Sequence, residues 1–95
     1  MAVYRITRFA ASDMDKAVEL AETMRPTLEN LGAIFIDMVS YENGKGVVIA
    51  KYPDQATMDR ASEAAKNAFV TLIGAGAVDG DSVHPHTGKV LLSFT

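Results

Sequence analysis

Residues 33–52, A-I-F-I-D-M-V-S-Y-E-N-G-K-G-V-V-I-A-K-Y, are the stretch that decides the fold. Two apolar runs rich in β-branched and aromatic residues flank Asn43-Gly44. This dipeptide is typical of a two-residue hairpin turn, because both central positions of that turn need positive φ. The pattern therefore predicts two antiparallel strands joined by a tight turn.

The turn also predicts how the two strands pair. If Glu42 pairs with Lys45, the strands run back one residue for one residue, and Phe35 faces Tyr52. One face of the hairpin then carries Phe35, Asp37, Val39, Tyr41, Val48, Ala50 and Tyr52. The other face carries Ile34, Ile36, Met38, Ser40, Val47, Ile49 and Lys51. Neither face shows the regular polar alternation of a solvated sheet, so we expect both to be covered.

The composition indicates a single domain over residues 1–95 and excludes several classes of function. The hydrophobic fraction is 48%, the charged fraction is 22%, and the net charge is −3. This net negative charge gives no indication of a basic surface that would bind nucleic acid or an anionic membrane. No apolar run has the length of a bilayer span, and the N-terminus lacks the apolar core of a signal peptide. The absence of cysteine excludes disulfides and thiol nucleophiles. We expect a cytoplasmic protein.

A strand and an interrupted helix are predicted before the hairpin. Residues 3–9, V-Y-R-I-T-R-F, have the β-branched and aromatic character of a strand. Ser12, with Asp15 three residues on, predicts the start of a helix, and Gly32 predicts its end. Pro26 removes a backbone donor, so we expect a kink or break near residues 24–25. The apolar stripe of this helix consists of Met14, Ala17, Val18, Ala21, Met24, Leu28 and Leu31.

A second helix and a last strand are predicted after the hairpin. Asp54 is the expected N-cap of the helix and Gly74 its end. Its apolar stripe consists of Met58, Ala61, Ala65, Ala68, Phe69 and Leu72. Residues 74–88 are predicted to form a loop without regular structure, of a length that is often functional or mobile. Residues 90–94, V-L-L-S-F, are the predicted last strand.

The resulting order βαββαβ predicts a ferredoxin-like α+β fold. Right-handed crossovers give a four-stranded antiparallel sheet in the order 4-1-3-2, with both helices on one face. The opposite face would then expose an apolar and aromatic patch, which monomers rarely tolerate. We therefore expect two copies to dimerise sheet to sheet. The residues expected on this face are Tyr4, Ile6, Phe35, Val39, Tyr41, Val48, Ala50 and Tyr52.

With this element order, Y-R-I-T-R-F at residues 4–9, the hairpin, and K-Y-P-D-Q-A-T at residues 51–57, the sequence resembles the dimeric α+β barrel superfamily. The resemblance implies a homodimer with a ligand cavity between sheet and helices. Members include antibiotic-biosynthesis-type and haem-degrading monooxygenases, isomerases and stress-responsive barrels. The haem-degrading enzymes use an asparagine, a tryptophan and a histidine, but the corresponding positions here hold Thr7, Lys51 and an apolar residue near Val70. We therefore do not expect the active site of the haem-degrading enzymes in this chain.

Aligned in this way, Lys51 lies on the helix side of the sheet, together with the rest of its hairpin face. The expected ligand-binding residues are Arg5, Thr7, Met14, Met24, Ile36, Met38, Ile49, Lys51, Met58 and Phe69. Arg5 and Lys51 are expected at the same end of the sheet, near the N-terminus of the second helix, where an anionic group is favoured. One interpretation is a pocket for a fatty or aromatic acid. The other is that both side chains extend into water over apolar surface.

His84 and His86 flank Pro85 and form the only histidine cluster. In an extended segment both imidazoles point to one side, and with Asp79 or Asp81 they are weak candidates for a divalent-metal site. The alternative is a pair of solvated histidines. No catalytic residue or cofactor is assigned. Two functions remain open: a homodimer that binds an apolar ligand, or a cofactor-independent monooxygenase or isomerase.

Overall fold

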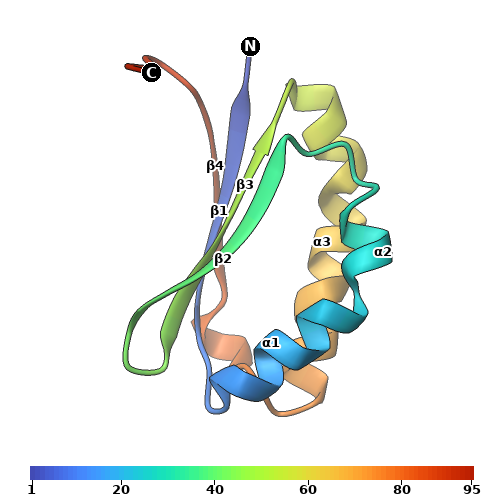
Figure 1. Cartoon of the computed structure of the whole chain (residues 1–95), viewed down its shortest axis with the longest axis vertical. Helices are drawn as coiled ribbons and strands as arrows, with labels where there is room; N and C mark the ends of the chain where they lie inside the picture. Colours follow the sequence, from blue (N-terminus) through green and yellow to red (C-terminus); the bar gives the residue numbers. More distant parts are fainter.

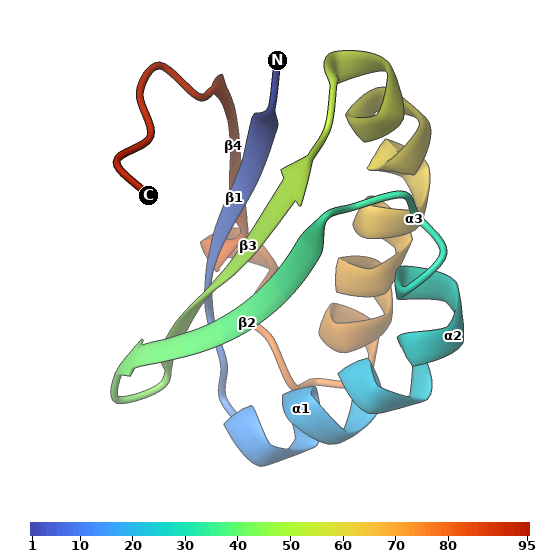
Figure 2. The ribbon, with the colours of Figure 1, turned by 45° about the horizontal axis from the view of Figure 1, so that its top comes forward.

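Four antiparallel strands form one sheet, in the order β2-β3-β1-β4, in the computed structural model, which describes residues 1–95 (Figure 1). The strands are β1 (Val3–Ala10), β2 (Phe35–Glu42), β3 (Lys45–Tyr52) and β4 (His84–Lys89). The helices are α1 (Met14–Thr23), α2 (Arg25–Leu28) and α3 (Gln55–Gly74), followed by the 3₁₀ turn η1 (Gly80–Ser82). All three α-helices lie on one face of the sheet and leave the other face open (Figures 1 and 2). The predicted fold class and strand order are confirmed.

The hairpin turn forms at Asn43-Gly44 as predicted, but only Gly44, and not Asn43, has the predicted positive φ, and the register of the strands differs from the prediction. Glu42 pairs with Lys45, and Gly44 has a φ of 73°. Between Ser40 and Glu42 the register shifts, so that Tyr41 is an extra residue in β2 and Phe35 pairs with Lys51. Such a β-bulge places two residues of one strand against one of its partner. A shift of one residue exchanges the two faces of a strand, so the predicted faces of β3 are wrong.

The corrected pairing places the even-numbered residues of β3 on the helix side. Arg5 pairs with Ala50 across β1 and β3, and Ile36 pairs with the same Ala50 across β2 and β3. Ala50 and Tyr52 are buried, at 4% and 1% exposure. The open face of β3 consists instead of Val47, Ile49 and Lys51.

The cap of the first helix lies one residue later than predicted. Asp13, and not Ser12, accepts a hydrogen bond at Oδ1 from the Lys16 backbone N–H, at 3.0 Å. The Ser12 hydroxyl instead donates to the Gly76 carbonyl, at 2.7 Å. The predicted break before Pro26 is confirmed, because α1 ends at Thr23 and α2 begins at Arg25. The helical segment already ends at Leu28, ahead of the predicted stop at Gly32.

The C-terminal strand is earlier in the chain than predicted. Residues 84–89, H-P-H-T-G-K, form β4 and pair with β1 from Arg8↔His84 to Val3↔Lys89. Residues 90–95 lie outside the sheet, so both the predicted loop over 74–88 and the predicted strand over 90–94 are wrong. Polar residues and a proline are tolerated here because β4 is an edge strand.

Two groups of buried residues pack the sheet against the helices. The first consists of Val3, Ala50, Tyr52, Met58 and Ala61. The second consists of Phe9, Ala17, Leu72, Ala77 and Val78. Val3 and Phe9 come from the two ends of β1, so the groups lie at opposite ends of the sheet. Arg5 and Thr7 fall between them. No helix in the structure has the length and apolar character needed to cross a membrane.

The N-cap of α3 makes the stability of the fold depend on pH in the acidic range. Asp54 Oδ1 accepts hydrogen bonds from the Thr57 hydroxyl at 2.7 Å and the Thr57 backbone N–H at 2.8 Å. These bonds, that from the hydroxyl most of all, hold the pKa of Asp54 below its usual range. The ionised Asp54 carboxylate therefore stabilises the folded protein at pH values above the usual aspartate pKa of about 4. This contribution is lost as the pH falls through the lowered pKa of Asp54 in the folded protein.

We expect Asp54→Asn to keep an acceptor at this cap without the titrating charge, and Asp54→Ala to remove the acceptor. Thermal unfolding followed between about pH 7 and pH 2 tests both. The alanine variant should unfold at a lower temperature than wild type at neutral pH. The asparagine variant should lose less stability than wild type as pH falls below about 4. Parallel curves for wild type and Asp54→Asn would contradict this account of the cap.

Candidate ligand-binding site

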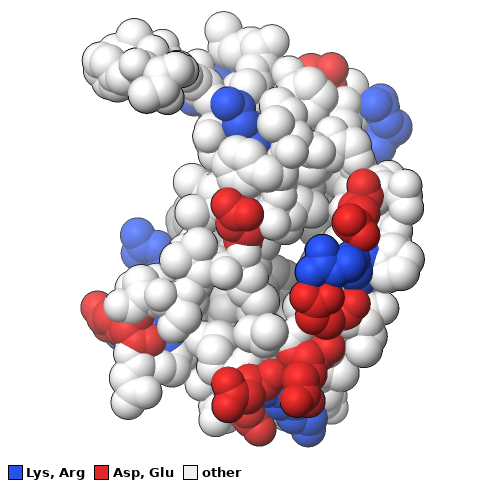
Figure 3. Space-filling view, viewed as in Figure 1, with Lys and Arg blue, Asp and Glu red and all other residues white.

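A cavity of about 1150 Å³ lies between the helix-facing side of the sheet and the three helices. Of the 30 residues that line it, 20 are hydrophobic, so its wall suits an apolar molecule. Figure 3 shows this side of the molecule hollowed between the sheet and the helices, with charged side chains gathered along the helices. The cavity occupies the space between the two buried groups at the ends of the sheet.

Six of the ten predicted ligand-binding residues line this cavity. They are Arg5, Thr7, Met24, Ile36, Met38 and Phe69. Met58 faces the sheet but is 2% exposed within the first buried group, and Met14 packs against the second. Ile49 and Lys51 are on the open face, because the bulge at Tyr41 changes the register of β2 against β3. Their predicted place beside Arg5 is therefore wrong.

Lys51 has a different environment from Arg5. Its Nζ lies 5.8 Å from the centroid of the Tyr4 ring, on the open face of the sheet. A cation at this distance from an aromatic face is attracted by the ring quadrupole. The predicted pair of cations at one end of the cavity is thus reduced to Arg5 alone.

The cavity also uses residues that the sequence did not identify as ligand-binding. Leu28 and Leu31 line it from α2 and the loop that follows, Tyr52 lines it from β3, and Ser62 lines it from α3. The helical periodicity already placed Leu28 and Leu31 on the apolar stripe. Ser62 lies four residues after Met58, a spacing that puts it on the same side of α3. The predicted register places Tyr52 on the opposite face, because the bulge has no clear sequence signal.

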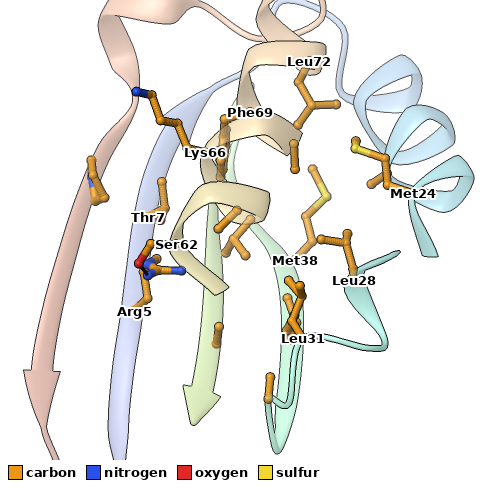
Figure 4. A pocket seen from close by; sticks show the side chains of 18 of the residues that line it. Arg5, Thr7, Met24, Leu28, Leu31, Met38, Ser62, Lys66, Phe69 and Leu72 are labelled. Carbon is orange, nitrogen blue, oxygen red and sulfur yellow. Dashed lines mark hydrogen bonds between the residues drawn. The ribbon is translucent and has the colours of Figure 1, made fainter. Parts of the chain in front are cut away.

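Arg5 is the central polar residue of the site (Figure 4). Its Nη2 donates to the Ser62 hydroxyl at 2.6 Å and to the Met58 carbonyl at 3.2 Å. Its Nη1 is buried and has no hydrogen-bond partner. No carboxylate forms an ion pair with Arg5, since the ion pairs of the chain are Arg25–Glu22 and Lys45–Glu42. Arg5 is part-buried and has no counter-charge, so an anionic group from a ligand would be stabilised here.

Tyr52 lies beside this guanidinium. The Arg5 Cζ atom is 5.7 Å from the centroid of the Tyr52 ring. Burial raises the pKa of the Tyr52 phenol, and the positive charge of Arg5 offsets part of that increase. The phenol therefore stays protonated at neutral pH, and Tyr52 adds no negative charge that could neutralise Arg5.

The other charged residues around the cavity lie on the exposed surfaces of the helices. The Arg25 guanidinium donates to Glu22 at 2.8 Å and holds the pKa of that carboxyl below its usual range. These two charges neutralise each other. Glu29 and Lys66 are exposed, and Figure 4 shows the Lys66 side chain extending away from the apolar part of the cavity. Arg5 is therefore the part-buried cation of the site.

The two histidines are on β4 and are exposed. His84 pairs with Arg8 and His86 with Ile6, which places both on the open face, away from the cavity. No group of three histidine, aspartate or glutamate side chains in the structure is placed to hold a metal ion. Asp79 instead accepts a hydrogen bond from the Asp81 backbone N–H, at 3.1 Å. The structure therefore gives no support to the predicted metal candidates His84 and His86.

Neither the family models nor the curated proteins contain a match to this sequence. Solved structures do match. SnoaB, a cofactor-independent oxygenase from Streptomyces nogalater, has a TM-score of 0.77 at 11% identity, over 97% of this chain and 95% of that one. A putative antibiotic biosynthesis monooxygenase from Bordetella bronchiseptica has a TM-score of 0.68 at 11% identity, over 96% and 98%.

A third similar structure is a dimeric ferredoxin-like protein from an uncultured marine organism. It has a TM-score of 0.69 at 13% identity, over 99% of this chain and 91% of that one. All three alignments cover nearly the whole chain, although few residues are identical. The chain therefore has the ferredoxin-like α+β fold found in antibiotic biosynthesis monooxygenases and in dimeric ferredoxin-like proteins.

Proposed function

We propose that this protein is a homodimer that binds a small, largely apolar carboxylic acid between its sheet and its helices. The observation that carries the proposal is the Arg5 guanidinium, whose Nη1 is buried and unpartnered in a cavity with a mainly apolar wall. A carboxylate is planar and accepts two parallel hydrogen bonds, which matches the fork of a guanidinium. A fatty or aromatic acid combines this head group with an apolar body.

The shape of the cavity supports one orientation of such a ligand. Arg5 and Ser62 lie at the side formed by β1 and α3, while Met24, Leu28 and Met38 form the side toward α1, α2 and β2 (Figure 4). The head group would contact Arg5, and the apolar body would lie against the methionines and leucines. Methionine side chains adapt to different ligand shapes. The cavity volume of about 1150 Å³ is slightly above the range of roughly 300 to 1,000 Å³ that is typical of small-molecule sites, so the cavity has room for such a ligand.

The homodimer is proposed because the helices cover only one face of the sheet. The open face carries the apolar and aromatic residues Tyr4, Ile6, Phe35, Val39 and Ile49, and among them the charged residues Arg8, Asp37 and Lys51. Ile6 and Val39 are each 39% exposed. Contiguous apolar patches on monomers are uncommon and usually mark an interface. The dimeric ferredoxin-like protein of similar structure supports the same assembly.

The carboxylate proposal predicts that Arg5→Met weakens binding of medium- and long-chain fatty acids or aromatic acids. A charge-assisted hydrogen bond contributes about 1.5 to 3 kcal/mol. The loss of affinity should therefore be roughly ten- to hundredfold. Ligand-detected NMR and native mass spectrometry with a panel of these acids measure it. The corresponding alcohols should bind wild type and Arg5→Met with more similar affinities, because they lack the charge.

Lys51→Met is the matched control, since it removes a cation on the opposite face of the sheet. This variant should bind the acids as tightly as wild type does. Equal weakening by the two substitutions would show that net charge, and not the Arg5 site, governs binding. Absence of binding across the whole panel would overturn the proposed ligand class.

The assembly is tested by analytical ultracentrifugation of wild type and of Ile6→Asp. Wild type should sediment as a dimer, and the charge placed at the centre of the open face should weaken dimerisation at least roughly tenfold. Val70→Asp places the same charge on α3, at a side chain that is 56% exposed, and should leave the dimer intact. A wild-type monomer would leave the apolar open face unexplained.

A second function is favoured by the similar structures. SnoaB is a cofactor-independent oxygenase, and it matches nearly the whole chain. An oxygenase of this kind would hold an aromatic substrate in the same cavity. Arg5 would then stabilise an anionic oxygen of the substrate, since its Nη1 has no other partner.

Oxygen uptake in the presence of quinol-type substrates distinguishes an oxygenase from a binding protein. An oxygenase should consume dioxygen with these substrates, and Arg5→Met should lower the rate, while Lys51→Met should not. Binding of acids without oxygen uptake favours the binding function. Substrate-dependent uptake that is unchanged in Arg5→Met would place the reaction outside this cavity.

A further inference from the structure

The hydroxyl of Ser62 holds the guanidinium of Arg5 against α3 (Figure 4). It accepts a hydrogen bond from Arg5 Nη2 at 2.6 Å and donates one to the Met58 carbonyl at 3.1 Å. The same Nη2 also donates to the Met58 carbonyl, at 3.2 Å. The hydroxyl, the carbonyl and Nη2 are thus bonded to one another in pairs, on the side of the guanidinium that faces α3. Nη1 is left without a partner.

The Arg5 side chain would be far less constrained without this hydroxyl. It would keep only the longer hydrogen bond, to the Met58 carbonyl, and its packing against the Tyr52 ring. Thr87, which pairs with Arg5 across β1 and β4, lines the cavity and is exposed, so water reaches this side of the cavity. An arginine side chain has many rotamers, and a cation next to water tends to extend into it. The Ser62 hydroxyl therefore restricts which way the guanidinium points.

A serine at this position is unfavourable for α3 itself. The neighbouring positions of the same side of the helix are mainly alanine, at Ala61, Ala65 and Ala68. Alanine has the highest helix propensity of all residues. A serine hydroxyl that bonds back to the carbonyl four residues earlier, as Ser62 does to Met58, slightly destabilises a helix. The hydroxyl therefore does not serve the helix, and its contact with Arg5 is the interaction that alanine could not replace.

We propose that Ser62 is a positioning residue, which fixes the orientation of Arg5 so that Nη1 faces the anionic group of a ligand. The inference rests on the proposed function, and it makes selection of an anionic head group depend on a residue of α3 as well as on one of β1. Ser62 acts through Arg5: it binds Nη2 before the ligand arrives, so less entropy is lost when the anion binds. A ligand without a charged group gains nothing from this arrangement.

The first test measures the hold on Arg5 without any ligand, by NMR of ¹⁵N-arginine-labelled protein at low temperature. Hindered rotation about the Nε–Cζ bond should give the wild-type Arg5 separate Nη1 and Nη2 signals, assigned by their absence in Arg5→Met. Ser62→Ala should speed this rotation and merge the two signals, whereas Ser62→Thr keeps the hydroxyl and should keep them separate. Thr71→Ala is the matched control. The Thr71 hydroxyl makes the same kind of bond within α3, to the Asn67 carbonyl at 3.1 Å, but none to Arg5.

The second test compares the affinities of the same variants for dodecanoate and for dodecanol, by native mass spectrometry. Ser62→Ala should weaken binding of dodecanoate roughly fivefold, the loss expected for about one hydrogen bond, and should leave binding of dodecanol unchanged. Ser62→Thr should restore the affinity for dodecanoate, and Thr71→Ala should alter neither affinity. Thermal unfolding should show Ser62→Ala to be at least as stable as wild type, because alanine favours the helix. A selective loss in a stable variant cannot come from damage to the fold.

The two tests separate the failure of the positioning role from the failure of the proposed ligand class. Merged Arg5 signals in wild type, or signals that stay separate in Ser62→Ala, would overturn the positioning role and leave the carboxylate proposal standing. Equal affinity of wild type and Ser62→Ala for dodecanoate would do the same. Wild-type protein that binds neither probe would overturn the proposed ligand class, and the NMR comparison alone would then decide whether Ser62 orients Arg5.

Discussion

The extra residue at Tyr41 is the constraint on which the rest of the structure depends. The β-bulge there changes which residues of β3 share a face with Ile36 and Met38 of β2. With the bulge, Ala50 and Tyr52 join Val3 of β1 against the helices. Gly46 accommodates this arrangement: a Cβ at that position would lie 2.6 Å from Cζ of Phe9 and 3.0 Å from the Val39 carbonyl oxygen. Close packing of the Phe9 ring over Gly46 thus requires glycine opposite the bulge.

The same register separates the two cations that the sequence placed together. Arg5 pairs with Ala50, and because Ala50 has no long side chain, the guanidinium has room to reach α3 and contact Ser62. Lys51, one residue further along β3, points to the opposite face and lies near the Tyr4 ring. The bulge therefore affects the chemistry of the cavity as well as the packing of the sheet.

Local sequence signals predicted the elements well, and pairing over long distances was predicted poorly. Asn43-Gly44 and Asp54 act within a few residues, and the structure confirms the position of the turn and the helix cap, although only Gly44 of the turn has a positive φ. Pro26 likewise ends α1 where expected. The bulge at Tyr41 and the start of β4 depend instead on how distant segments fit against β1. The apolar segment V-L-L-S-F has a higher strand propensity than H-P-H-T-G-K, but the polar segment is the one that pairs with β1.

Strand β1 connects the proposed cavity with the proposed dimer interface. Its alternating side chains place Arg5 and Thr7 toward the helices, and Tyr4 and Ile6 on the open face. The strand is held between β3 and β4 along most of its length, so it cannot shift relative to the sheet without breaking two ladders of hydrogen bonds. A second copy packed on Ile6 would therefore also restrain the backbone from which Arg5 projects. In the proposed homodimer, Arg5 would thus be held both by its bonds to α3 and by a strand that assembly makes more rigid, a form of preorganisation that would lower the entropy lost when an anion binds.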